Sequence, residues 1–131
     1  MKWALYMASK GFRVFPLAEN GNKPIGEGWP ELASSDPDVI AAWWDTGYEV
    51  RLKGEKPRLR VLSDQNNYAV LTDEMIVLDV DVKDGRSGRE TFDSYNPNLE
   101  TFTVRTPSGG THHYYSSWGL SYANSQGNAK H

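Results

Sequence analysis

The first third of the chain switches between helical and strand-like spacing of hydrophobic residues. Apolar residues within 2–10 recur at helical intervals, and Gly11 stands where a C-terminal cap belongs. Residues 12–17 carry the apolar pattern of a strand, whereas the Gly, Asn and Pro of residues 20–30 are typical of a loop. The pattern therefore predicts a helix, a strand and a loop in this order.

A second helix and three further strands are predicted next. Asp36 can accept hydrogen bonds from free N–H groups of a helix start, and Pro37 suits the first helical position. Alternating residues at 48–52 and 59–62 predict a hairpin, and residues 68–72 predict another strand.

The last third of the chain has the most informative pattern. Residues 75–82, MIVLDVDV, predict a strand with a buried first half and two acids in its second half. Ser87 can start a short helix, and residues 101–105 and 112–115 predict two strands around the loop 106–110. The whole order indicates an α/β (α+β) fold with two layers and a mostly antiparallel sheet.

Length and composition bound the protein class. A chain of 131 residues fits one domain, which we assign to residues 1–120, followed by a polar and disordered tail at 121–131. There is no apolar run of the roughly 20 residues that a membrane helix needs, so we expect a cytoplasmic protein without membrane contact. The absence of cysteine leaves carboxylates, imidazoles and carbonyls as metal ligands. The net charge of −3 gives no global attraction to nucleic acid.

Asp79 and Asp81 are the first candidates for chemistry. On a strand, two residues separated by one position point to the same face, so both carboxylates would lie side by side. A divalent cation such as Mg²⁺ or Mn²⁺ relieves the repulsion between such a pair. The alternative is that the strand ends there and both acids are solvated in a turn with Lys83 and Asp84.

The segment SGGTHHYY is the second candidate. Ser108, Gly109 and Gly110 precede His112, and exposed N–H groups of such a turn together with an imidazole suit a triphosphate. The alternative is an ordinary glycine turn of a hairpin, with His113 pointing the opposite way.

Other candidates have weaker support. Lys23 lies in a loop where it could touch phosphate or simply be solvated. A basic cluster that could follow a nucleic-acid backbone, or could merely protect an exposed strand edge, spans the predicted hairpin: Arg51, Lys53, Lys56, Arg58 and Arg60. Tryptophans could stack on bases, although Trp43 and Trp44 fit a helix core better.

Taken together, these segments resemble a known family. ALYMASKGFRVFPL, the DPDVIAAWW helix, MIVLDVDVKDG and FTVRTPSGGTHHYYSS occur in the same order in the N-terminal bifunctional primase-polymerase domain of phage, plasmid and mobile-element replication proteins. That domain is part of the archaeo-eukaryotic primase superfamily. The match spans most of the chain, and its last two blocks are the specific ones.

The resemblance implies an RRM-like core and nucleotidyl transfer. It implies that Asp79 and Asp81 bind the catalytic Mg²⁺ or Mn²⁺ ions, and that His112, with Ser108, Gly109 and Gly110, contacts the phosphates of a nucleoside triphosphate. Arg105 would steady phosphate charge or be solvated. The implied partners are nucleoside triphosphates, a single-stranded DNA template or primer-template, and a replicative helicase.

Two departures from the family pattern leave two functions open. Residues 48–62 are longer and more basic than the connection in the family, and Glu100 is the last acid, so a third metal-binding acid after His112 is absent. The missing third acid suggests a core truncated at its C-terminus. One hypothesis is a nucleotidyltransferase or a fragment of one. The other is a catalytically inactive module that binds nucleic acid, nucleotide or a replication partner.

Overall fold

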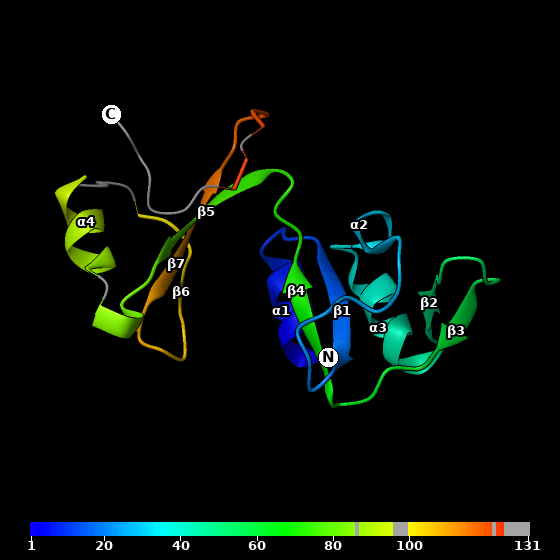
Figure 1. Cartoon of the computed structure of the whole chain (residues 1–131). Coiled ribbons are helices and arrows are strands. Elements are labelled where there is room, and N and C mark those ends of the chain that lie inside the picture. The colour runs from blue at the N-terminus through cyan, green and yellow to red at the C-terminus, as the bar shows by residue number, and fades with distance from the viewer. Residues whose placement is uncertain (86, 96–99, 122, 125–131) are drawn as a thin grey trace. The chain divides into compact units, whose positions relative to one another are not determined.

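The computed structural model describes residues 1–85, 87–95, 100–121 and 123–124. Its internal packing forms two compact units, Met1–Leu71 and Thr72–His131, each of which is treated by itself. Helices and antiparallel strands occur in both units (Figure 1), which confirms the α+β class. The boundary of the predicted single domain at residue 120 stays a prediction, and most of the predicted tail at 121–131 lies outside the described residues.

Unit 1 contains three helices and four strands among the described residues. β1 pairs with β4, and β2 pairs with β3, both antiparallel. The second pair is the hairpin that alternation predicts. In chain order the elements are α1 (Lys2–Ser9), β1 (Val14–Glu19), α2 (Trp29–Leu32), α3 (Pro37–Asp45), β2 (Tyr48–Val50), β3 (Arg58–Arg60) and β4 (Asn66–Val70).

The predicted helix ends are confirmed in unit 1. Gly11, just after α1, has φ +88°, a left-handed conformation that glycine adopts without a steric penalty. The Asp36 carboxylate accepts the Asp38 N–H at 2.8 Å at the start of α3. The short helix α2 differs from the predicted loop because tertiary contacts hold it. The Trp29 ring packs on Phe15 with centroids 4.6 Å apart.

The core of unit 1 joins α1, β1, α3 and β2. Asn66 is a buried polar residue beside this core, and its amide donates to the Leu17 carbonyl at 2.9 Å and accepts the Ser63 N–H at 2.8 Å. These bonds satisfy backbone groups that would otherwise be buried without a partner. The apolar members include Ala4, Met7, Ala8, Val14, Phe15, Leu17, Ile40, Trp43, Tyr48 and Val50.

Unit 2 contains one three-stranded antiparallel sheet of order β5-β7-β6 among the described residues. β7 is therefore the central strand (Figure 1). Within the described parts of both units, no helix has the length and apolar content to cross a membrane. The elements of unit 2 are β5 (Met75–Val80), the 3-10 turn η1 (Lys83–Gly85), α4 (Gly88–Ser94), β6 (Thr103–Arg105) and β7 (Thr111–Ser116).

β5 ends two residues earlier than the predicted strand 75–82. The Asp81 carboxylate accepts the Lys83 N–H at 2.9 Å, and Asp84 and Gly85 have positive φ of 58° and 73°. This local bond and these left-handed residues turn the chain away from the sheet. Ser87 precedes α4 as predicted but makes no side-chain capping bond.

Tyr48 generates a prediction about alkaline stability. Its side chain is 1% exposed, its ring packs edge-on against Trp43, and its hydroxyl has no hydrogen-bond partner in the described residues. Burial raises the pKa of Tyr48 to about 12. Because the unfolded tyrosine ionises near pH 10, the unfolded state binds fewer protons between pH 10 and 12, and stability is lost as pH rises through that window.

We expect Tyr48→Phe to unfold no more easily than the wild type at pH 7, because it removes an unsatisfied buried hydroxyl. Between pH 10 and 12 its unfolding free energy should fall less steeply, by up to about 1.4 kcal/mol per pH unit. Urea unfolding followed by tryptophan fluorescence measures this difference. The half-exposed Tyr6→Phe is the control, and identical pH slopes for Tyr48→Phe and the wild type would contradict the assignment.

Candidate functional site around Asp79 and His112

The antiparallel register of β5 and β7 brings two predicted site residues together. Asp79 and His112 are direct cross-strand partners, and His112 Nε2 lies 3.5 Å from Asp79 Oδ1. The Asp79 side chain is 66% exposed and that of His112 36% exposed. Since β7 is central, His112 also has Val104 of β6 opposite it. The pair is therefore a carboxylate and an imidazole on one open face of the sheet, accessible to a ligand.

His113 lies on the other face of β7, as its position next to His112 predicts. Its Nδ1 is 3.1 Å from the Thr103 hydroxyl oxygen, and its Nε2 is 2.8 Å from that of Thr111. Its ring stacks on Phe92 of α4 with centroids 4.3 Å apart. His113 is thus an anchor that joins α4, β6 and β7, and it leaves the His112 face without that helix.

The loop 106–110 is a tight hairpin connection between β6 and β7. Thr106 N–H donates to the Gly110 carbonyl at 2.9 Å, and Gly109 N–H donates to the Thr106 carbonyl at 3.0 Å. Gly109 has φ +89°, the left-handed conformation that a three-residue hairpin loop requires at its last position. The Ser108 and Thr106 hydroxyls lie 3.1 Å apart and are the polar side chains of the loop.

Close backbone contacts fix this loop and α4 against the end of β5. A Cβ on Gly110 would lie 2.4 Å from the Val80 carbonyl oxygen, and a Cβ on Gly88 would lie 2.3 Å from that of Asp81. No side chain fits at such distances. The two glycines therefore allow the hairpin loop and the start of α4 to approach the segment that carries Asp79 and Asp81.

The second acid of the pair is placed less regularly than the first. Asp81 follows the end of β5 and takes part in the turn with Lys83, so the common face predicted for Asp79 and Asp81 stays a prediction. Among the described residues, no three His, Asp or Glu side chains gather in an arrangement that could hold a metal. The oxygen ligands that this segment offers are the carboxylates of Asp79 and Asp81.

The other predicted site residues are distributed over both units. Arg105 is the cross-strand partner of Thr111, which puts it on the His113 face of the sheet. Lys23 belongs to unit 1, where its carbonyl accepts the Ala18 N–H at 2.8 Å. The predicted basic cluster of the hairpin also lies in unit 1, on and between β2 and β3.

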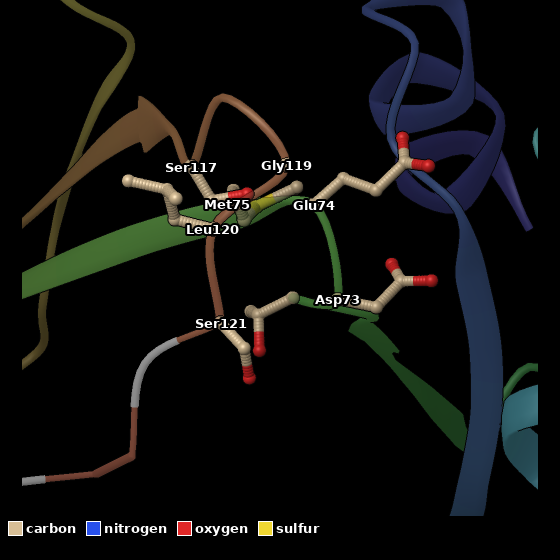
Figure 2. A pocket seen from close by; sticks show the side chains of 8 residues that line it. Asp73, Glu74, Met75, Ser117, Gly119, Leu120 and Ser121 are labelled. Atoms are coloured by element: carbon tan, nitrogen blue, oxygen red, sulfur yellow. The ribbon is translucent and has the colours of Figure 1, made fainter.

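A hollow of ≈ 590 Å³ lies at the opposite end of β5 from Asp79. Met75 and Ser117 contribute to its wall (Figure 2), and the carboxylates of Asp73 and Glu74 point away from Met75 and Leu120 in that view. Asp79 lies four positions after Met75 on β5, which is about 13 Å at the usual rise of a strand. The hollow therefore contains none of the residues predicted to act on a nucleotide.

The family described as the bifunctional DNA primase/polymerase N-terminal domain matches residues 4–131. The chain belongs to this family. The primase/polymerase match covers both units, so both carry the pattern of the family. Searches among curated proteins and among solved structures gave no match.

Membership confirms the resemblance inferred from the sequence and gives the general function. The chain is a primase/polymerase-type domain of DNA replication, a type that implies binding of nucleotide and DNA and generally uses divalent metals. For the primase/polymerase motifs, sequence reasoning correctly put His112 and His113 on opposite faces. It missed the anchoring contacts of His113, for which threonines at 103 and 111 beside a histidine were the available signal.

Gly110 generates a prediction about this site. We expect Gly110→Ala to destabilise unit 2 by about 1–3 kcal/mol, because the added methyl group would press on the Val80 carbonyl and force the strands apart. Amide hydrogen exchange in β5 and β7 measures the loss of protection. Gly21→Ala is the control, because a Cβ there meets its nearest neighbour at 3.4 Å, an ordinary contact. Unchanged protection in Gly110→Ala would contradict the close approach.

Proposed function

We propose that this domain catalyses nucleotidyl transfer to a DNA primer, with the Asp79–His112 pair at its active site. The supporting observation is the cross-strand pairing of these two side chains on an open sheet face, 3.5 Å apart. An acid that holds a metal and a donor to phosphate can contact the same nucleoside triphosphate when they are neighbours on one face of a sheet. The replication context is that of a phage, plasmid or mobile element, with a single-stranded DNA template or primer-template and a replicative helicase as partners.

The donor set fits a hard divalent cation. Asp79 and Asp81 offer carboxylate oxygens, the ligands that Mg²⁺ and Mn²⁺ prefer, and Asp79 is open to solvent. These two acids would hold the metal. When bound, such an ion neutralises charge on the phosphoryl oxygens as the α-phosphate is transferred.

His112 and the hairpin loop would bind the triphosphate. His112 Nε2, which lies opposite Asp79 on the neighbouring strand, would donate a hydrogen bond to a phosphate oxygen. The Gly109 N–H is already donated to Thr106, so the Ser108 hydroxyl is the loop group that we assign to a phosphate oxygen. Gly109 and Gly110 act by shaping the loop rather than by supplying a side chain.

Asp81 favours a second candidate function. Its carboxylate already accepts the Lys83 N–H in the turn after β5, which is the bond expected of an ordinary turn aspartate. A module that keeps the family fold and binds nucleotide, nucleic acid or a replication partner without catalysis would need Asp81 only for this turn. Nucleotide incorporation separates the two functions, since only the first extends a primer.

The test is calorimetric titration of Mn²⁺ with a nucleoside triphosphate into the wild type and three variants. We expect saturable binding by the wild type, and binding at least about tenfold weaker in Asp79→Asn with Asp81→Asn, and in His112→Ala, because each removes a charged or donor group from the site. Asp84→Asn is the matched control. It removes one carboxylate charge three positions after Asp81. Asp84 has a left-handed backbone conformation, which asparagine tolerates.

Equal affinity in the wild type and the double aspartate variant would disprove the metal-binding role of this pair. Binding lost in Asp84→Asn as well would mean that general negative charge, rather than the Asp79–His112 site, attracts the metal. Binding without primer extension on a single-stranded template would favour the second candidate function.

A further inference from the structure

Positive charge is concentrated in one short segment of this acidic chain. Residues 51–60, RLKGEKPRLR, hold five cations and a single carboxylate and thus carry a net charge of +4, whereas the whole chain carries −3. Lysines also protect exposed strand edges from pairing. A net charge of +4 within ten residues of an otherwise acidic chain is in addition the local charge that attracts an anionic partner.

The segment forms an exposed hairpin. β2 presents Tyr48 and Val50 to the core, whereas all three residues of β3 are exposed. The connection turns at Leu52 to Glu55, where the Glu55 N–H donates to the Leu52 carbonyl at 3.1 Å. One strand thus fixes the hairpin to unit 1, and the other strand and the turn remain open to solvent.

Internal ion pairs use some of the cations and leave the others available. Arg51 Nε lies 2.5 Å from the Glu49 carboxylate, and Arg60 Nη2 lies 3.5 Å from that of Glu19. These two arginines are therefore engaged in ion pairs within unit 1. The remaining three are exposed and make no ion pair with any carboxylate of the described residues: Lys53, Lys56 and Arg58.

Apolar side chains accompany these cations. Leu59 is 68% exposed and Val61 is 56% exposed, although both alternate with arginines on or beside β3. A duplex offers a protein mainly phosphates and groove edges, whereas a single strand offers phosphates together with unpaired bases whose faces are apolar. Cations next to exposed aliphatic groups fit the single strand better.

We propose that the β2–β3 hairpin binds a single nucleic-acid strand. Lys53, Lys56 and Arg58 contact phosphates of the strand, and Leu59 and Val61, which alternate with Arg58 and so lie on the other face of β3, contact unpaired bases. The inference goes beyond the nucleotide site, because it uses residues of unit 1 alone and requires neither metal nor triphosphate. In this proposal, residues 48–62 form a hairpin that holds the nucleic-acid strand.

The experiment uses fluorescence anisotropy of a labelled single-stranded 20-mer, without metal or nucleotide, over a series of salt concentrations. Each phosphate contact to a single strand contributes about 0.7 to the slope of log K against log salt. We expect Lys53→Gln with Lys56→Gln to lower that slope by about 1.4. Between 50 and 200 mM salt the affinity of this variant should therefore fall by a factor about sevenfold smaller than the affinity of the wild type. Adding Arg58→Gln should lower the slope by about 2 in total.

The matched control is Lys2→Gln with Lys10→Gln, at the start of α1 and just after its end. It removes two exposed lysines from the same unit, but each of these already lies against an aromatic ring, at 5.8 Å from Trp3 and 5.4 Å from Tyr6. Its slope should change by less than about 0.5. Leu59→Ala should weaken binding severalfold with an unchanged slope, because it removes apolar contact and no charge.

No binding of the 20-mer by the wild type, equal slopes in the wild type and the hairpin variant, or equal effects of the two lysine pairs would overturn the proposal. Tighter binding of a duplex than of the single strand would overturn the assignment of the partner, and unchanged affinity in Leu59→Ala would overturn the contact with bases. The double Asp79→Asn, Asp81→Asn variant should bind the 20-mer like the wild type. The anisotropy result therefore tests the hairpin even if Asp79 and Asp81 prove not to form a nucleotide site.

Discussion

The register between β5 and β7 is the constraint on which the candidate site depends. Cross-strand partners share a face of the sheet, so this one alignment decides that Asp79 meets His112 and that Leu78 meets His113. A slip by one residue would move every one of these side chains to the wrong face. The hairpin loop after β6 and the near contact of Gly110 with Val80 leave little room for such a slip.

The two faces of this small sheet are held by different means. Hydrogen bonds between His113 and two threonine hydroxyls, together with the stacked ring of Phe92, secure the face of His113, and α4 packs there. On the other face, a row of aromatic side chains, Phe102 and Tyr114, leads to His112. The side with the acid thus combines aromatic contacts with an Asp79 side chain that stays accessible to solvent.

Sequence reasoning succeeded where local chemistry decides the conformation. The Asp36 cap, the hairpin of β2 and β3, and the strands that carry Asp79 and His112 were all predicted, since caps, glycine turns and alternation are local signals. It failed for α2, because the contact of Trp29 with Phe15 is tertiary. It also predicted too long a strand at β5. The alternation of apolar residues continues through residue 82, whereas the turn at Asp81 ends the strand at Val80.

The basic hairpin also affects how a partner reaches the protein. The net charge of −3 is the balance of +4 in residues 51–60 and −7 elsewhere, so the chain is strongly polarised although its total charge is small. A polyanion that approaches by diffusion is repelled by most of the chain and attracted to this hairpin. Encounters are therefore oriented before any contact forms, and the association rate falls as added salt screens this field.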